Sequence, residues 1–221
     1  MAIDVSTLIK DPSTSLKEST GSGAFSTVFE TEIPNIVIKR VDKMWDPTLL
    51  YYIWCMNQQK KKSWMPKIYG ITVDYTSEVY AQGIAYVIMK KLTSRLDVSQ
   101  KTPYTTGEAY NDYDLIELKQ LLEHESVIGK KKAAEITDMI LEVTSMIQST
   151  PKTKNECLFF DAHNDNWMWD DETLILNDPF TVKGWSNIDG NTSRTSALTN
   201  VSYLHATKSA AVNVIGEFKY D

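Results

Sequence analysis

The sequence predicts an α+β fold arranged as two lobes, and three observations support this prediction. The first part of the chain places β-favouring runs around one apolar helical stretch, which is typical of an antiparallel sheet carrying one helix. The middle of the chain repeats apolar residues at helical spacing, so the second lobe is expected to be mainly helical and reduced in size. The chain has 221 residues, which is enough for two closely joined lobes.

The N-terminal lobe is expected over residues 16–92, after an N-terminal arm over residues 1–15. Residues 16–40 contain β-favouring stretches on both sides of Ile33-Pro34-Asn35. Proline and asparagine between two such stretches indicate a turn, so this segment predicts a hairpin.

A helix and two further strands are expected to complete this lobe. Asp46 and Pro47 have the residue types of a helix N-cap and first helical position, and they predict an amphipathic helix that runs to about Lys60. Residues 67–74 and 81–90 predict two more strands. The lobe would then hold a sheet of about five strands.

The C-terminal lobe is expected over residues 93–221. Residues 93–111 are polar and have no steady period, so they predict a loop or insertion. Apolar residues recur at helical spacing over residues 115–122 and, more strongly, over residues 136–147. A polar segment closes the chain.

Charge and composition argue against several classes of partner. The net charge is −6, so broad attraction to nucleic acid or to an acidic membrane is not expected. The lysine clusters at residues 60–62 and 130–132 are interpreted as solvated helix ends. No run approaches the roughly 20 apolar residues that a membrane span needs, so a cytoplasmic protein is expected. Cys55 and Cys157 both adjoin apolar residues and are expected to be buried thiols.

A glycine-containing turn over residues 21–28 is the first candidate for ligand binding. Gly21 and Gly23 let the backbone bend tightly and approach a charged ligand. Phe25 is placed to cap the tip of this turn, and Val28 to lie against an adenine ring. Gly-x-Gly turns also join strands without binding anything, and this turn lacks the lysine of a P-loop.

Lys39 is the second candidate, because it ends the apolar run IVIK. A strand would fix its backbone and direct its ammonium group towards whatever the glycine turn covers. The alternative interpretation is a surface lysine at a strand end, beside Arg40.

The segment FFDAHNDN provides the sharpest signal. Asp161 and Asn166 on one loop can respectively accept a hydroxyl proton and hold a metal ion. Two alternatives stay open: a different metal cluster formed by Asp161, His163 and Asp165, and a plain Asx-rich turn without a ligand.

Asp178 is the last candidate and follows an apolar run. Residues 166–170 and 173–177 predict two short strands joined by an acidic turn. Such a hairpin would bring Asn166 and Asp178 to one end, where they could share a cation.

In this order the motifs GSGAFSTV, IVIK, FFDAHNDN and LNDPF resemble the protein-kinase-like superfamily, and more closely the serine/threonine protein kinases of T7-like bacteriophages. The resemblance implies a two-lobed kinase fold and an ATP- and Mg²⁺-dependent enzyme that phosphorylates host or phage proteins in the bacterial cytoplasm. The D-x-H-x-x-N form also looks like that of aminoglycoside and choline kinases, which phosphorylate small molecules.

The resemblance implies a role for each matching residue. Lys39 would hold the α- and β-phosphates of ATP, and Asp161 would be the catalytic base. Asn166 and Asp178 would bind Mg²⁺. We therefore expect Lys39 to face the two metal ligands across one nucleotide cleft.

The same resemblance implies an adenine site and shows departures from the family pattern. Met89 would lie near the gatekeeper position, and Lys91 would belong to the hinge that contacts adenine. The third loop glycine is Ser26, and the usual D-F-G is Asp178-Pro179-Phe180. The resemblance also implies an acid in the next helix that pairs with Lys39, but this helix contains no acid after Asp46, so Asp46, another acid or no acid takes that role. These departures leave open a kinase fold that binds a partner without catalysis.

Overall fold

The computed structural model describes residues 5–23, 25–77, 82–93, 129–148, 158–160, 166–182, 200, 202–207 and 211–217. The described residues form a mixed α+β fold with a mostly antiparallel sheet and a few helices. The chain divides into two compact units. The first unit contains Met1–Gln59, Pro66–Lys91 and Asp189–Asp221, and the second contains Lys60–Met65 and Leu92–Ile188.

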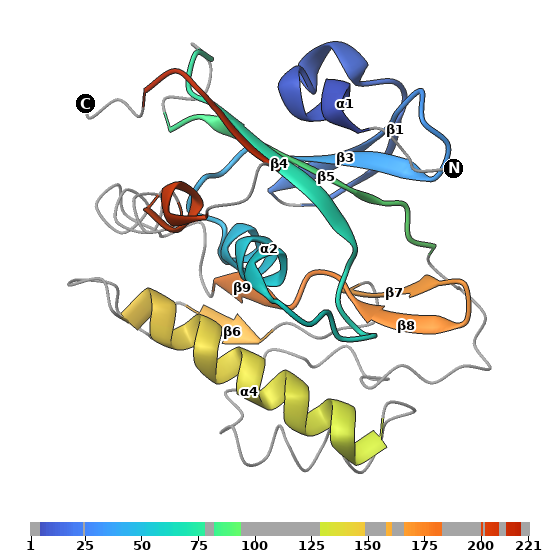
Figure 1. Ribbon diagram of the computed structural model, residues 1–221, viewed down its shortest axis with the longest axis vertical. Coiled ribbons are helices and arrows are strands. Elements are labelled where there is room, and N and C mark those ends of the chain that lie inside the picture. Colours follow the sequence, from blue (N-terminus) through green and yellow to red (C-terminus); the bar gives the residue numbers. More distant parts are fainter. Residues whose placement is uncertain are drawn as a thin grey trace. The chain divides into compact units, whose positions relative to one another are not determined.

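The first unit is built on a six-stranded sheet in the order β1-β2-β3-β5-β4-β10 (Figure 1). Its antiparallel strands are β1 (Ser19–Ser22), β2 (Ser26–Glu30), β3 (Ile36–Val41), β4 (Ile68–Asp74) and β5 (Ile84–Lys90). The sixth strand, β10 (Val212–Ile215), pairs with β4 in parallel. The predicted hairpin and strand pair are therefore confirmed, whereas β10 was missed because four residues carry too short a pattern.

Helix α2 (Pro47–Asn57) begins where the sequence predicted. The Asp46 carboxylate accepts a hydrogen bond from the Thr48 N–H group at 2.9 Å, and Pro47 takes the first helical position. Every residue from Pro47 to Cys55 is buried. The expected amphipathic character is therefore wrong, because a helix buried on all sides needs no polar face.

The two faces of the sheet carry different helices (Figure 1). Helix α1 (Ser6–Lys10), which precedes a short 3-10 turn η1 (Ser13–Ser15), packs on one face through Leu8. Leu8 joins a buried cluster on that face with the side chains of Ile36, Ile38, Ile84, Tyr86 and Ile88. Helix α2 covers the opposite face. Residues 1–15 were expected to be an arm, but Leu8 places part of this segment in the core.

The last part of the chain returns to the first unit. The buried Asn200 side-chain amide donates to the carbonyl oxygens of Met44 at 2.7 Å and Asp46 at 3.1 Å. Asn57, at the end of α2, donates to the Thr207 hydroxyl at 3.2 Å. The division of the chain thus differs from the expected C-terminal lobe over residues 93–221, because these contacts join positions that no sequence period links.

The described part of the second unit contains one long helix and two pairs of antiparallel strands. The helix α4 (Gly129–Gln148) includes the predicted helix and starts earlier. Strand β6 (Leu158–Phe160) pairs with β9 (Phe180–Val182), and β7 (Trp167–Asp170) pairs with β8 (Thr173–Leu176). The buried side of α4 is mostly apolar. It comprises Ala133, Ile136, Met139, Ile140 and Val143, together with Thr137, whose hydroxyl donates to the Ala133 carbonyl oxygen at 2.9 Å.

Several smaller predictions can be compared with these units. Cys55 is buried, as expected, and Lys130 and Lys131 are exposed at the start of α4. The predictions for residues 94–111 and 115–122, and for Cys157, lie outside the described residues. In the described part of the chain, no helix has both the length and the apolar character that a membrane crossing requires.

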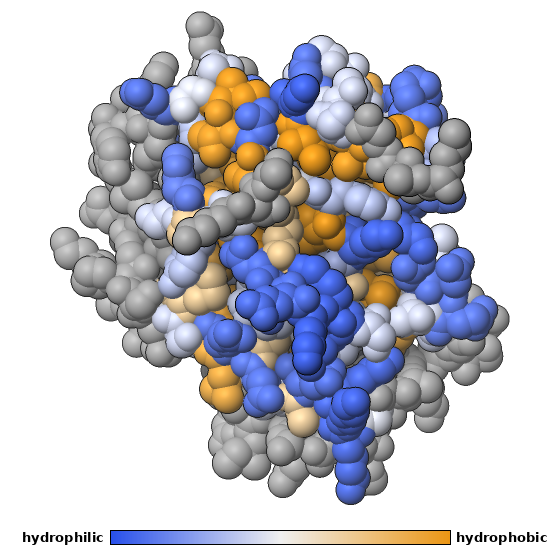
Figure 2. Space-filling model, in the orientation of Figure 1, coloured by the Kyte–Doolittle hydropathy of each residue, from blue (hydrophilic) through white to orange (hydrophobic). Residues whose placement is uncertain are grey.

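The edge formed by β4 and β10 is partly open at the surface. Every residue of β10 is half-buried. Figure 2 shows apolar side chains between polar ones over the region of α1 and the β4–β10 pair. An edge strand has a neighbouring strand on one side alone in the described sheet, so its other side stays partly exposed.

Gly70 of β4 allows α1 and the start of β10 to approach the sheet closely. A Cβ atom at this position would lie 2.7 Å from the Ala211 carbonyl oxygen and 2.7 Å from side-chain carbons of Ile9. The Thr72 hydroxyl donates to the Ile9 carbonyl, and the Asn213 amide donates to the same oxygen at 3.3 Å. These contacts leave no room for a larger residue.

We therefore expect Gly70→Ala to lower the free energy of unfolding by about 1–3 kcal/mol, the usual effect of overpacking. Urea denaturation followed by circular dichroism measures this change. Gly21→Ala is the matched control, because a Cβ at Gly21 would meet no atom of the described residues within 4 Å. Equal stability of both variants would show that α1 and β10 can move away from β4 without cost.

Candidate functional site

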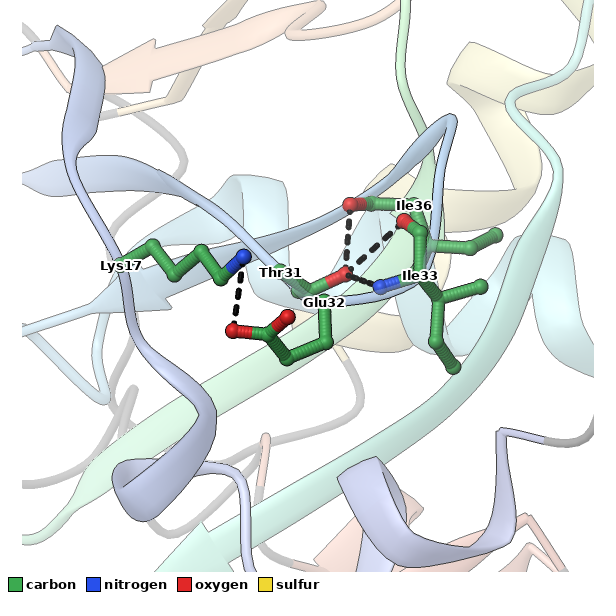
Figure 3. Close-up of polar contacts among 5 residues, drawn as sticks. All are labelled: Lys17, Thr31, Glu32, Ile33 and Ile36. Atoms are coloured by element: carbon green, nitrogen blue, oxygen red, sulfur yellow. Dashed lines mark hydrogen bonds and ion pairs between the residues drawn. The ribbon is translucent and has the colours of Figure 1, made fainter.

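The turn between β2 and β3 is held by side-chain contacts to the backbone (Figure 3). The Thr31 hydroxyl accepts a hydrogen bond from the Ile33 N–H group at 3.1 Å and donates to the Ile36 carbonyl oxygen at 2.9 Å. Beside it, the Lys17 ammonium nitrogen lies 2.7 Å from a Glu32 carboxylate oxygen. These contacts fix how β2 and β3 pair.

The resulting register places three predicted site residues in one row across the sheet. Val28 is paired with Lys39, and Gly21 is paired with Val28. Val87 of β5 continues the row on the other side of Lys39. Directly paired residues of antiparallel strands lie on the same face. Gly21, Val28 and Lys39 therefore share one face of the sheet.

The Lys39 side chain is buried against helix α2. It is 4% exposed, and its ammonium nitrogen donates a hydrogen bond to the Tyr52 hydroxyl at 3.0 Å. The same nitrogen lies 5.2 Å from the centre of the Tyr52 ring. The sequence did not predict Tyr52 as a partner of Lys39, because a tyrosine within an apolar run gives no charge signal.

The glycine turn leaves space above its backbone. The Gly23 N–H group donates to the Ser26 carbonyl at 2.8 Å and closes the turn between β1 and β2. In the described structure, a Cβ at Gly21 would meet nothing within 4 Å, and one at Gly23 would come no closer than 3.8 Å to Ser26. Phe25 contacts Trp45 edge to face, with ring centres 4.9 Å apart. Its ring therefore packs on the connection that precedes α2.

The two residues expected near adenine lie in and after β5. Met89 is buried and paired with Val37, which puts it on the same face as Lys39. Lys91 lies after the strand, and its ammonium nitrogen is 2.6 Å from a Glu30 carboxylate oxygen. Contact of these residues with adenine stays a prediction.

In the second unit, the β7–β8 hairpin has the predicted strands and acidic turn. Trp167 is paired with Leu176, and the Asn177 N–H group donates to the Asn166 carbonyl at 2.8 Å. Asp178 follows directly in the sequence. Asn166 and Asp178 thus lie at the same end of the hairpin, as their spacing predicted.

A second strand pairing flanks the same segment. Phe160, the residue before Asp161, is paired with Phe180. The connection from β8 to β9, which contains Asp178, is therefore bordered by the backbone of Phe160. Residues 161–165, with the predicted base Asp161, lie outside the described residues.

Asn177 lies at the same end of the hairpin and was not predicted from the sequence as a site residue. Its side-chain oxygen is buried and has no hydrogen-bond partner among the described residues, while its amide nitrogen lies 3.5 Å from the Met168 sulfur. A buried acceptor without a donor costs free energy. A cation or a hydrogen-bond donor beside the Asn177 side-chain oxygen would therefore be favourable at this end of the hairpin.

The oxygen-rich character of this place fits magnesium. Asn166 and Asp178 offer amide and carboxylate oxygens, the ligand types that Mg²⁺ prefers. Within the described ranges, no group of three or more histidine, cysteine, aspartate or glutamate side chains could hold a metal ion. A Mg²⁺ site formed by Asn166 and Asp178 stays a prediction.

Trp64 ties the β7–β8 hairpin and helix α4 to one segment. Its carbonyl accepts from the Leu176 N–H group at 2.9 Å, and its indole N–H donates to a Glu135 carboxylate oxygen at 3.0 Å. Lys62 lies 3.1 Å from the other Glu135 oxygen. Trp64 is fully buried, so the segment forms part of the core.

Both tryptophans of β7 are also buried. The alternation of Trp167 and Trp169 along the predicted strand indicated that one of them lies in the core and that the other covers the metal site. They are 2% and 9% exposed, and they lie on one face because they alternate along the strand. Both therefore belong to the core of the second unit.

The surroundings of Glu135 shift its pKa. Partial burial raises the pKa, but hydrogen bonds from Trp64 and Lys62 and the charge of Lys131 lower it by more. The net result is a pKa below the ordinary value for glutamate. The charged form is thus favoured in the folded protein.

Each unit holds one group of candidate residues. The first holds a buried ammonium on the sheet face that carries the glycine turn, and the second holds amide and carboxylate oxygens at one hairpin end. No protein-family model matches this chain, and no curated protein matches its sequence. The functional proposal therefore depends on these residues.

We expect Glu135→Gln to lower the free energy of unfolding by about 1 kcal/mol at pH 7, because a charged hydrogen-bond acceptor is lost. A carboxyl group whose pKa is lowered by folding contributes its stability above the unfolded pKa, and this contribution is lost as the pH falls through the folded pKa. The difference between wild type and Glu135→Gln should therefore shrink on acidification below about pH 4.5.

Urea titrations between pH 7 and pH 3 measure this difference. Asp138→Asn provides the control, since Asp138 is an exposed carboxylate on the same helix. A difference for Glu135→Gln that stays constant over the whole pH range would contradict the assigned contacts.

Proposed function

We propose that this protein is an ATP- and Mg²⁺-dependent phosphotransferase of the bacteriophage serine/threonine protein kinase type. It would have the two-lobed kinase fold and act on host or phage proteins in the bacterial cytoplasm. The cross-strand row of Gly21, Val28 and Lys39 is the observation that carries this proposal. It joins a glycine turn with space above its backbone to a buried ammonium, a combination suited to the phosphates of a nucleotide.

The proposed roles follow the chemistry of each residue. Lys39 binds the α- and β-phosphates, and Asp161 accepts the proton of the substrate hydroxyl. Asn166 and Asp178 hold Mg²⁺, which neutralises charge on the phosphates during transfer. Met89 lies on the adenine side.

A second candidate is a kinase fold that binds a partner without catalysis. Lys39 contacts a tyrosine of the helix in which the kinase resemblance implies an acid. This contact favours the alternative. It predicts weak or absent binding of Mg²⁺-ATP in calorimetry. Phosphorylation of a metabolite instead of a protein would point to a small-molecule kinase.

The catalytic assignment predicts loss of label transfer in Asp161→Asn. Full-length protein is incubated with labelled ATP, Mg²⁺ and a bacterial lysate. We expect the rate to fall by roughly 100-fold or more, the usual contribution of a general base. Asp171→Asn is the control, because Asp171 is exposed and has a positive φ of 52° that asparagine also adopts readily. Equal labelling by Asp161→Asn and wild type would refute the assigned base.

The metal assignment predicts a higher magnesium requirement for Asp178→Asn. Removal of the carboxylate weakens the hold on Mg²⁺, so the half-maximal Mg²⁺ concentration should rise on the order of tenfold. Initial rates of label transfer over a series of Mg²⁺ concentrations give this value. An unchanged magnesium requirement would exclude Asp178 as a ligand, with Asp171→Asn again as control.

A further inference from the structure

Lys39 and Tyr52 form a contact that the motif pattern did not predict. The lysine is on β3 and is 4% exposed, and the tyrosine is on α2 and is fully buried. A buried ammonium costs free energy unless it is hydrogen-bonded. The Tyr52 hydroxyl accepts such a bond at 3.0 Å.

This contact restricts the ammonium. The hydrogen bond fixes the distance of 3.0 Å between the ammonium nitrogen and the Tyr52 hydroxyl oxygen, and the centre of the Tyr52 ring lies 5.2 Å from the same nitrogen. An ammonium carries three N–H donors, so a bond to the hydroxyl is compatible with a further bond to a phosphate oxygen.

Tyr52 itself is held firmly. Its helix is buried from Pro47 to Cys55 and capped by Asp46. The Asn200 amide donates to the Met44 and Asp46 carbonyls just before the helix. The hydroxyl therefore belongs to a rigid part of the first unit.

We infer that Tyr52 is a positioning residue that holds the Lys39 ammonium in place for the phosphates of the nucleotide. This inference rests on the proposed function, because it gives Tyr52 a role in nucleotide binding through Lys39. Tyr52 itself is not assigned a contact with the nucleotide.

A double-mutant cycle tests this role. Binding of a non-hydrolysable ATP analogue with Mg²⁺ is measured by calorimetry for wild type, Tyr52→Phe, Lys39→Met and the double variant. Tyr52→Phe should weaken binding about fivefold in the wild-type background, the size expected for one net hydrogen bond. In the Lys39→Met background it should have no further effect, because the group it positions is gone.

Tyr51→Phe is the matched control. Tyr51 is the neighbouring residue on α2, is equally buried and loses the same hydroxyl group. It should leave affinity for the analogue unchanged. Circular dichroism of all variants checks that they are folded.

The possible results separate the inference from the proposed function. Absence of binding in the wild type would overturn both. Binding in the wild type with an unchanged affinity in Tyr52→Phe would overturn the inference alone. The same loss in both backgrounds would also overturn it, because the effect would then not pass through Lys39.

Discussion

The register between β2 and β3 is the constraint on which the candidate nucleotide site depends. A slip of one residue would turn Lys39 to the opposite face, where Ile36 and Ile38 pack beneath α1. Thr31 fixes the register from inside the turn through its hydroxyl group. A contact at the end of the hairpin thus decides whether the lysine ammonium meets α2.

Helix α2 and this register together determine where the positive charge of Lys39 lies. Its apolar surroundings exclude water, so an ammonium on the facing strand needs hydrogen-bond acceptors, and the Tyr52 hydroxyl is one of them. The helix in turn depends on its Asp46 cap and on Asn200, which donates to the carbonyls around that cap. The position of the Lys39 ammonium therefore depends on Asn200, in the last part of the chain.

The second unit uses strand pairing to gather polar groups. The β7–β8 hairpin sets Asn166 beside Asn177, and the β6–β9 pair borders the same connection at Phe180. Trp64 adds a backbone link to β8 and a side-chain link to α4. Asp178 therefore lies on a segment that is fixed at both ends by backbone hydrogen bonds.

The sequence by itself determined the local elements and the spacing of the candidate residues. The N-cap at Asp46, the β2–β3 hairpin and the position of Asn166 and Asp178 at one hairpin end all follow from turn chemistry and strand periodicity, which act over a few residues.

The tertiary structure alone decided the partners of these elements. Tyr52, Trp64 and Asn200 acquire their roles from contacts between segments far apart in the chain, and β10 is a strand only because β4 offers it an edge. Side-chain hydrogen bonds and burial depend on which segments meet in space, and no periodic pattern in the sequence encodes that meeting.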